Sequence, residues 1–187
     1  YTYDEDIDKI QFLLARVYMK QGEVEKALAG FEKIRELNPF SEYLNESSFF
    51  LAKAYYEKND FKKTIELLQS YVKSKKPSYK YEAYQLMVKA HYRSENYKRA
   101  EELVQFLMKY YYRKDGFPSF LYEFSNDLKK KQRDTEKYED FIVSRFPSSI
   151  VAGKIFIDKG DDKFSKDNYE AAAYYYRKYL ETPGRER

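Results

Sequence analysis

Similar stretches of sequence return along this chain about every thirty-six residues, and this period constrains the fold more than any other feature. In each stretch an aromatic residue or Val is followed three positions later by a small residue. The pairs are Val24 and Ala27, Phe61 and Thr64, Tyr97 and Ala100, and Tyr169 and Ala172. The small residues lie 37, 36 and 72 positions apart, and 72 is twice 36. A chain with such a period is expected to fold as a stack of similar units.

The 72-residue gap predicts one more unit, centred near Thr135 or Glu136. Residues 118–147 can supply it, because a polar KQRD segment divides them into two stretches. We expect this fourth unit to be degenerate, with Glu123 and Asn126 at positions where an apolar side chain would pack.

Each unit has the pattern of two amphipathic helices joined by a short polar turn. Apolar residues recur at spacings of three and four on both sides of the turn, as an amphipathic helix requires. In the first unit they are Phe12, Leu14, Ala15 and Tyr18, then Ala27, Leu28, Phe31 and Ile34. Gly and Pro, at 6 and 5 residues, are too scarce for the many tight turns of an all-β protein. The sequence therefore predicts an all-α fold.

These positions resemble the tetratricopeptide (TPR) repeat family, whose unit is a helix–turn–helix. The matches in the first unit are Leu14, Ala15, Tyr18, Ala27, Phe31 and Pro39, and the resemblance extends from about residue 8 to 183. It implies a right-handed superhelical solenoid of about five repeats that forms a single domain over residues 1–187. The repeats would span about 8–41, 45–78, 81–114, 116–148 and 150–184. An unrelated helical bundle with coincidental spacing is the alternative.

In TPR proteins the first helix of each repeat lines a concave groove that binds a peptide or helix of a partner protein. The resemblance places groove residues at the fifth, ninth and twelfth positions of each unit, among others. The fifth positions hold Phe12 and Phe49, the ninth hold Arg16, Lys53 and Lys89, and the twelfth hold Met19, Tyr56, Tyr92 and Phe164. We hypothesise a basic row beside an apolar and aromatic row that binds a segment with acidic residues and apolar anchors. Alternatively, the aromatic residues pack between units and the cations are simply solvated.

Residues that could support catalysis are scarce. The chain has no Cys and one His, His91, at the position where two other repeats have Tyr18 and Tyr55. A lone His at a packing position is more often structural, and no ligand set for zinc is present. Phosphate-binding and nucleophile-elbow motifs are also missing from the sequence. We therefore expect a protein that is not an enzyme and that needs no cofactor or metal.

Residues 73–137 carry sixteen Lys and Arg against nine Asp and Glu. Basic residues beside aromatic ones can bind phosphates and stack on bases. An RNA- or anion-binding helical-repeat protein is therefore the alternative function. The repeated polar base-reading pair of pentatricopeptide proteins is not found, so we expect protein partners rather than nucleic acid.

The segments 37–72 and 145–184 each place Pro near Ser, then a long lead into a helix, a polar turn and an aromatic-rich helix. This organisation resembles bacterial cell-envelope TPR proteins, including outer-membrane assembly lipoproteins. The resemblance implies a scaffold in the periplasm or cell envelope, with a cytoplasmic location as the alternative. The sequence begins at Tyr1, so we expect a processed chain from which any signal peptide or lipid anchor has been removed. No apolar run is long enough to span a membrane, and the oligomeric state is left open.

Overall fold

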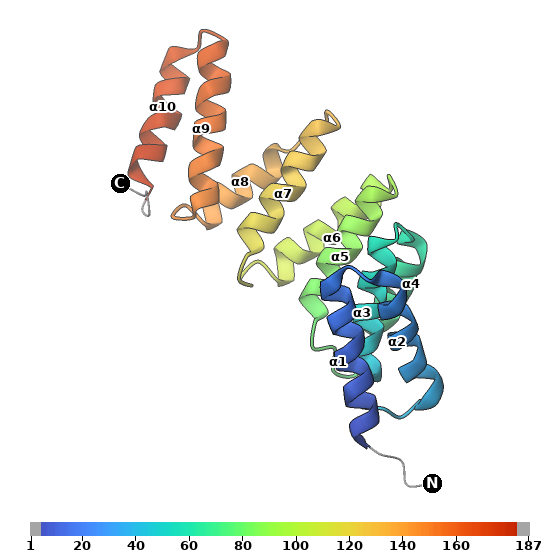
Figure 1. Cartoon of the computed structure of the whole chain (residues 1–187). Helices are drawn as coiled ribbons and strands as arrows, with labels where there is room; N and C mark the ends of the chain where they lie inside the picture. Colours follow the sequence, from blue (N-terminus) through green and yellow to red (C-terminus); the bar gives the residue numbers. More distant parts are fainter. Residues whose placement is uncertain (1–4, 183–187) are drawn as a thin grey trace. The chain divides into compact units, whose positions relative to one another are not determined.

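The computed structural model describes residues 5–182, and that part of the chain forms ten α-helices in five consecutive antiparallel pairs (Figure 1). The pairs are α1 (Glu5–Gln21) with α2 (Val24–Leu37), α3 (Leu44–Glu57) with α4 (Phe61–Tyr71), α5 (Lys80–Arg93) with α6 (Tyr97–Tyr110), α7 (Phe117–Lys130) with α8 (Glu136–Arg145), and α9 (Ile150–Ser165) with α10 (Tyr169–Glu181). The predicted all-α fold of helix–turn–helix repeats is confirmed, including the fourth unit that was placed by the period.

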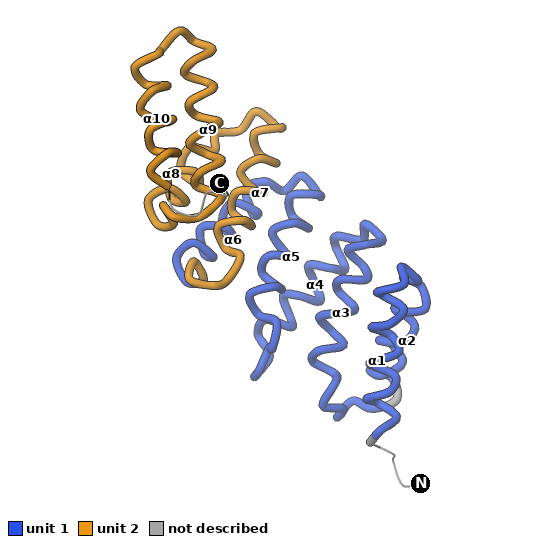
Figure 2. The backbone as a smooth tube through the Cα atoms, turned by 60° about the vertical axis from the view of Figure 1, so that its left-hand side comes forward, with its two compact units in different colours: residues 1–110 blue, residues 111–187 orange. Residues whose placement is uncertain are grey.

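The chain divides into two compact units, Tyr1–Tyr110 and Tyr111–Arg187 (Figure 2). In unit 1, α2 packs on α3 and α4 packs on α5, so neighbouring pairs stack on one another. In unit 2, both α7 and α8 contact α9. Stacking of this kind buries the apolar face that a single helix pair leaves open. The single domain expected over residues 1–187 stays a prediction.

The turns inside the five pairs share one backbone geometry. Each contains a residue with positive φ: Gly22, Asn59, Glu95, Gln132 or Asp167. The amide of the following residue donates a hydrogen bond back into the first helix, for example from Asp60 to the Tyr55 carbonyl at 2.9 Å. This bond satisfies a carbonyl that the end of a helix would otherwise leave open. The Asp60 side chain then caps α4 by accepting from the Lys63 amide at 3.0 Å, as its place in the polar turn predicted.

The core of unit 1 begins between the first two helix pairs. Its buried members include Phe12, Ala15, Ala27, Phe31, Ile34 and Leu51. Small residues allow α1 and α2 to approach closely, because a Cβ added at Gly30 would lie 2.8 Å from the Cβ of Ala15. This packing leaves Ile7, Ile10, Leu14 and Val17, on the opposite face of α1, exposed.

The fourth pair differs from the others in what it buries. The expectation that Glu123 holds a packing position is wrong, because Glu123 is exposed and the neighbouring Phe124 and Ser125 are buried, whereas Asn126 is partly buried. In addition, Glu139 on α8 is 5% exposed, and its carboxylate pairs with Lys129 at 2.6 Å. A buried carboxylate needs such a partner, since desolvation of an unpaired charge is costly. An ion pair therefore takes part in the packing of α7 against α8.

Candidate partner-binding groove

A groove of about 900 Å³ runs between α1 and α3 in unit 1. Its apolar lining comes mainly from Leu13, Val17, Met19 and Phe50, and its charged lining from Arg16, Lys20, Lys53 and Glu57. Three cations against one carboxylate give the lining an excess of positive charge. The groove therefore combines an apolar floor with basic side chains.

Helical periodicity brings these side chains to one side of each helix. Leu13, Val17 and Lys20 lie four and three residues apart, so they share one face of α1. Phe50, Lys53 and Glu57, at intervals of three and four residues, likewise share one face of α3. Because α1 and α3 are the first helices of successive pairs and contact each other, their two faces form one groove.

Phe50 lies at the centre of the charged part of the groove. The guanidinium carbon of Arg16 is 5.0 Å from the centroid of the Phe50 ring, and the Nζ atom of Lys53 is 5.8 Å from it. Both distances fit cation–π contacts, which hold a cation over an aromatic face while leaving it able to bind an anion. The two cations are therefore positioned over an apolar surface before any partner binds.

The structure brings three of the predicted groove residues together, since Arg16, Met19 and Lys53 all line this groove. It places Phe12 and Phe49 in the core instead, at 2% and 5% exposure. The Phe12 ring packs edge-on against Phe31, and the Phe49 ring stacks on Tyr79 with centroids 4.8 Å apart. These two rings support the groove from below and do not form its surface.

The predicted aromatic row has a packing role in each repeat where it was expected. The rings of Tyr56, Tyr92 and Phe164 lie 5.4 to 5.5 Å from the ring that starts the following helix. Their partners are Phe61, Tyr97 and Tyr169, respectively. Each aromatic pair closes the turn of its own helix pair, whereas the alternative expected these rings to pack between units.

The remaining predicted positions lie elsewhere. Lys89 is exposed on α5 and does not line the groove of α1 and α3. Phe164 is exposed at the end of α9, in unit 2. Whether either residue contacts a partner stays a prediction.

Sequence reasoning missed Leu13, Val17 and Phe50, which form much of the apolar floor. The signal that could have found them is the spacing of Leu13 and Val17 around Arg16, which puts an apolar strip beside the predicted cation. Phe50 directly follows Phe49, so a choice between the two needed the rotation of α3.

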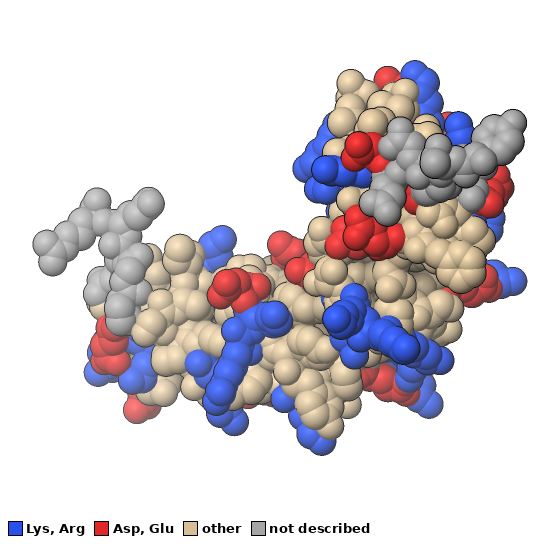
Figure 3. All heavy atoms as spheres, turned by 90° about the horizontal axis from the view of Figure 1, so that it is seen from below, with Lys and Arg blue, Asp and Glu red and all other residues tan. Residues whose placement is uncertain are grey.

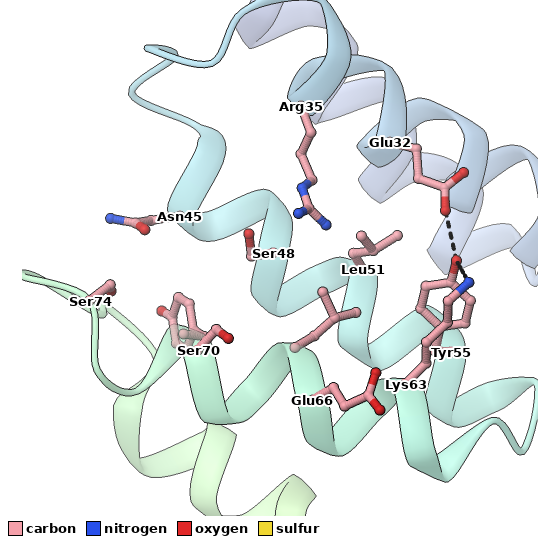
Figure 4. A pocket seen from close by; sticks show the side chains of 12 residues that line it. Glu32, Arg35, Asn45, Ser48, Leu51, Tyr55, Lys63, Glu66, Ser70 and Ser74 are labelled. Atoms are coloured by element: carbon pink, nitrogen blue, oxygen red, sulfur yellow. Dashed lines mark hydrogen bonds between the residues drawn. The ribbon is translucent and has the colours of Figure 1, made fainter.

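A second depression, of about 410 Å³, lies between α2, α3 and α4 (Figure 4). There the Tyr55 hydroxyl donates to the Glu32 carboxylate at 2.7 Å, and the ammonium of Lys63 donates to the Tyr55 hydroxyl at 2.9 Å. The hydrogen bond to Tyr55 raises the pKa of Lys63, followed in importance by the charge interaction with the same side chain. The Glu32 carboxylate and the Lys63 ammonium are thus already linked to each other through Tyr55.

His91, on α5, is buried, as expected for a packing position. Burial lowers the pKa of its imidazole, and the positive charge of Arg99 lowers it further. Neither ring nitrogen has a hydrogen-bond partner among the described residues. Within residues 5–182 there is also no group of three or more His, Asp or Glu side chains that could hold a metal ion.

The basic runs between residues 73 and 137 contain paired charges. Besides the Lys129–Glu139 pair, Lys130 pairs with Asp127 at 2.9 Å. On the face of the molecule shown in Figure 3, acidic side chains occur among the basic ones. Phosphate binding needs cations whose charge is available to the ligand. The use of these residues to bind RNA or another anion stays a prediction.

Between residues 5 and 182, no helix has both the length and the apolar character of a membrane span.

Solved structures of the protein MamA have a similar fold. One crystal structure of MamA has a TM-score of 0.61 and 17% identity, and the match covers 89% of this chain and 92% of that chain. A MamA double mutant has a TM-score of 0.64 and 14% identity, with 97% and 96% covered. At such low identity these matches show the fold alone. No curated protein matches the chain in sequence.

The model of one protein family, YfiO, described as an outer membrane lipoprotein, matches residues 8–183. This range is the one over which the TPR resemblance was predicted, and the predicted cell-envelope location is confirmed with it. The all-α TPR-type chain therefore belongs to the YfiO outer membrane lipoprotein family of the bacterial cell envelope.

Proposed function

We propose that this chain is a non-enzymatic scaffold that binds a segment of a partner protein in the groove between α1 and α3, as part of an assembly in the bacterial envelope. The segment, extended or helical, carries acidic residues and apolar anchors. The observation that supports this most directly is the placement of Arg16 and Lys53 over the ring of Phe50.

The apolar floor supplies one part of the binding free energy. An aliphatic or aromatic side chain of the partner that packs onto Leu13, Val17 and Phe50 removes apolar surface from water. Full burial of one such side chain stabilises a complex by about 1.5–3 kcal/mol. The partner residues beside this anchor must also carry groups that can bind Arg16 and Lys53.

The cations select the partner by charge. A carboxylate beside the anchor can accept paired hydrogen bonds from the Arg16 guanidinium, a geometry that ammonium groups do not offer. Lys53 then interacts with a second carboxylate along the segment. A basic segment would be repelled by Arg16 and Lys53 and attracted only by Glu57, the one carboxylate in the groove lining.

The proposal is tested by fluorescence anisotropy with three labelled twelve-residue peptides. One contains Asp and Leu, one contains Lys and Leu in the same order, and one contains Asp and Ser. The Asp–Leu peptide is expected to bind most tightly, because only it offers both chemistries. An Arg16→Glu/Lys53→Glu double variant should bind it at least about tenfold more weakly.

Arg35→Glu is the matched control, since Arg35 lies by the second depression. This substitution changes the same kind of charge on another face of the unit. Its affinity for the Asp–Leu peptide should equal that of the unaltered chain. An Arg16→Glu/Lys53→Glu variant that keeps its helical circular dichroism and its full affinity would contradict the proposal.

A further inference from the structure

The first helix of the chain carries apolar side chains on two of its faces. One face, with Phe12 and Ala15, is buried in the core of unit 1. The other, the outer face of α1, consists of Ile7, Ile10, Leu14 and Val17, which are between 40% and 59% exposed. Four aliphatic side chains in a row on one exposed helix face indicate a contact surface, because scattered single ones are ordinary but contiguous ones are not.

The spacing on this face is that of a coiled-coil seam. Ile7, Ile10, Leu14 and Val17 follow one another at intervals of three, four and three residues. This is the a/d pattern of a heptad repeat, which packs side chains of one helix between those of a second helix. The chemistry that fits the outer face is therefore another α-helix with an aliphatic seam of the same spacing.

We infer that the outer face of α1 binds the same face of a second copy of this chain, with the two α1 helices antiparallel. In an antiparallel pair, a positions meet d positions. Ile7 then packs against Val17 of the second copy, and Ile10 packs against Leu14 of the second copy. The seam is complementary to itself in this orientation, as a two-fold interface requires.

The charges beside the seam favour the antiparallel orientation. Asp6, Leu13 and Lys20 hold the g positions that flank the seam, and antiparallel packing sets g positions opposite each other. Asp6 therefore lies opposite Lys20 of the second copy, twice by symmetry, and Leu13 meets Leu13 of the second copy. In a parallel pair Asp6 would face Gln11 of the second copy, with no opposite charge.

One pair of helices makes a small interface. Stable complexes bury about 1,200–2,000 Å² in total, and weak, transient ones lie at the low end or below it. We therefore expect a weak, reversible dimer. Leu13, Val17 and Lys20 also line the groove of the proposed function, so the variants for sedimentation are chosen at Ile10 and Leu14, which do not.

Sedimentation velocity across a concentration series tests the dimer. The unaltered chain should shift from monomer to dimer as its concentration rises through the Kd, and an Ile10→Glu/Leu14→Glu variant should stay monomeric. Leu180→Glu is the matched control, because Leu180 is 54% exposed on α10 and should leave the shift unchanged. A monomer at every concentration, or a dimer that survives Ile10→Glu/Leu14→Glu, overturns the inference.

Cysteine cross-linking tests the orientation, since the chain has no Cys of its own. Leu13→Cys should form a disulfide-linked dimer under mild oxidation, because the two Leu13 positions meet at the two-fold axis. Ile7→Cys should not link to itself, because Ile7 faces Val17 of the second copy. Equal cross-linking of the two variants would overturn the antiparallel arrangement.

A charge exchange separates specific pairing from general apolar association. Asp6→Lys alone, or Lys20→Asp alone, places like charges opposite each other and should weaken the dimer several-fold. The combined Asp6→Lys/Lys20→Asp variant should restore it. Failure of the combined variant to recover, with its helical content intact, contradicts the proposed pairing of charges.

Discussion

The first and last helix pairs, α1–α2 and α9–α10, build the same structural unit with different side chains. Phe31 stands four residues after the small residue Ala27, is fully buried and stacks on Phe50. The equivalent residue of the last pair is Tyr176, four after Ala172, and it is only partly buried. The Tyr176 ring lies over Gly160, and its hydroxyl donates to Asp161 at 2.7 Å. The first pair thus depends on an enclosed apolar core and the last on a ring with a hydrated edge.

The outer faces of the two end helices differ in the same way. The outer face of α1 exposes four aliphatic side chains, whereas the large hydrophobic side chains exposed on α10 are Tyr169, Tyr174 and Leu180. A tyrosine keeps its hydroxyl in water while its ring covers the helix, so it tolerates exposure better than Ile or Leu. Exposed Tyr side chains on α10 therefore place less apolar surface in water than the exposed Ile, Leu and Val side chains of α1.

The largest effect that separates the two pairs is expected from removing the equivalent rings. Phe31→Ala should lower the free energy of unfolding by about 3–5 kcal/mol, because it opens a cavity in an enclosed core. Tyr176→Ala should cost less, since that ring is already partly hydrated. Urea unfolding gives the size, and hydrogen exchange of peptides from each pair gives the location. Equal losses from the two variants would show that the Phe31 and Tyr176 rings contribute equally to stability.

A smaller effect is expected at the two glycines that allow close approach. A Cβ at Gly30 meets the Cβ of Ala15, which is fixed to its helix, at 2.8 Å. At Gly160 it meets the ring of Tyr176 at 2.5 Å, but that ring can turn toward solvent. Gly30→Ala should therefore cost about 1–3 kcal/mol, and Gly160→Ala should cost less. Thermal unfolding of the two variants ranks them, and the reverse order would show that the Tyr176 ring is held rigidly.

The smallest effect is expected in the third helix pair, α5–α6, where His91 takes the place of Tyr18 and Tyr55. Its pKa is lowered in the folded chain, so the unfolded chain binds more protons as pH falls below about 6.5. Stability that is complete above that pH is therefore lost below it. Between pH 7.5 and pH 5, the unaltered chain should lose a few degrees more of its Tm than His91→Tyr does. Identical losses would show that carboxylates alone account for the acid sensitivity.

Much of the fold could be predicted from residues that repeat. The period of Ala27, Thr64, Ala100 and Ala172 marks the second helices, and the polar turns before them mark the boundaries. These signals are local, because turn geometry and helix periodicity depend on residues a few positions apart. Asp60 and Asn168 could therefore be placed at helix starts without knowledge of any tertiary contact.

The candidate groove was predictable only in part. Arg16 and Lys53 were found because both hold the ninth position of a repeat, and position within a repeat is a local property. Phe12 and Phe49 were placed in the groove although both are buried, and Phe50 was overlooked. The rotation of α3 against α1 decides between adjacent residues, and family positions do not fix it to within one residue.

Five helix pairs could be predicted from the spacing of residues along the chain, because helix periodicity and turn residues are local signals. Only the tertiary structure decided which side chains are exposed. Phe50 became the floor of a groove, and Ile10 and Leu14 were left in water, because α2 and α3 cover the other face of α1. Burial depends on contacts between residues distant in the chain, and these contacts are what a local pattern does not contain.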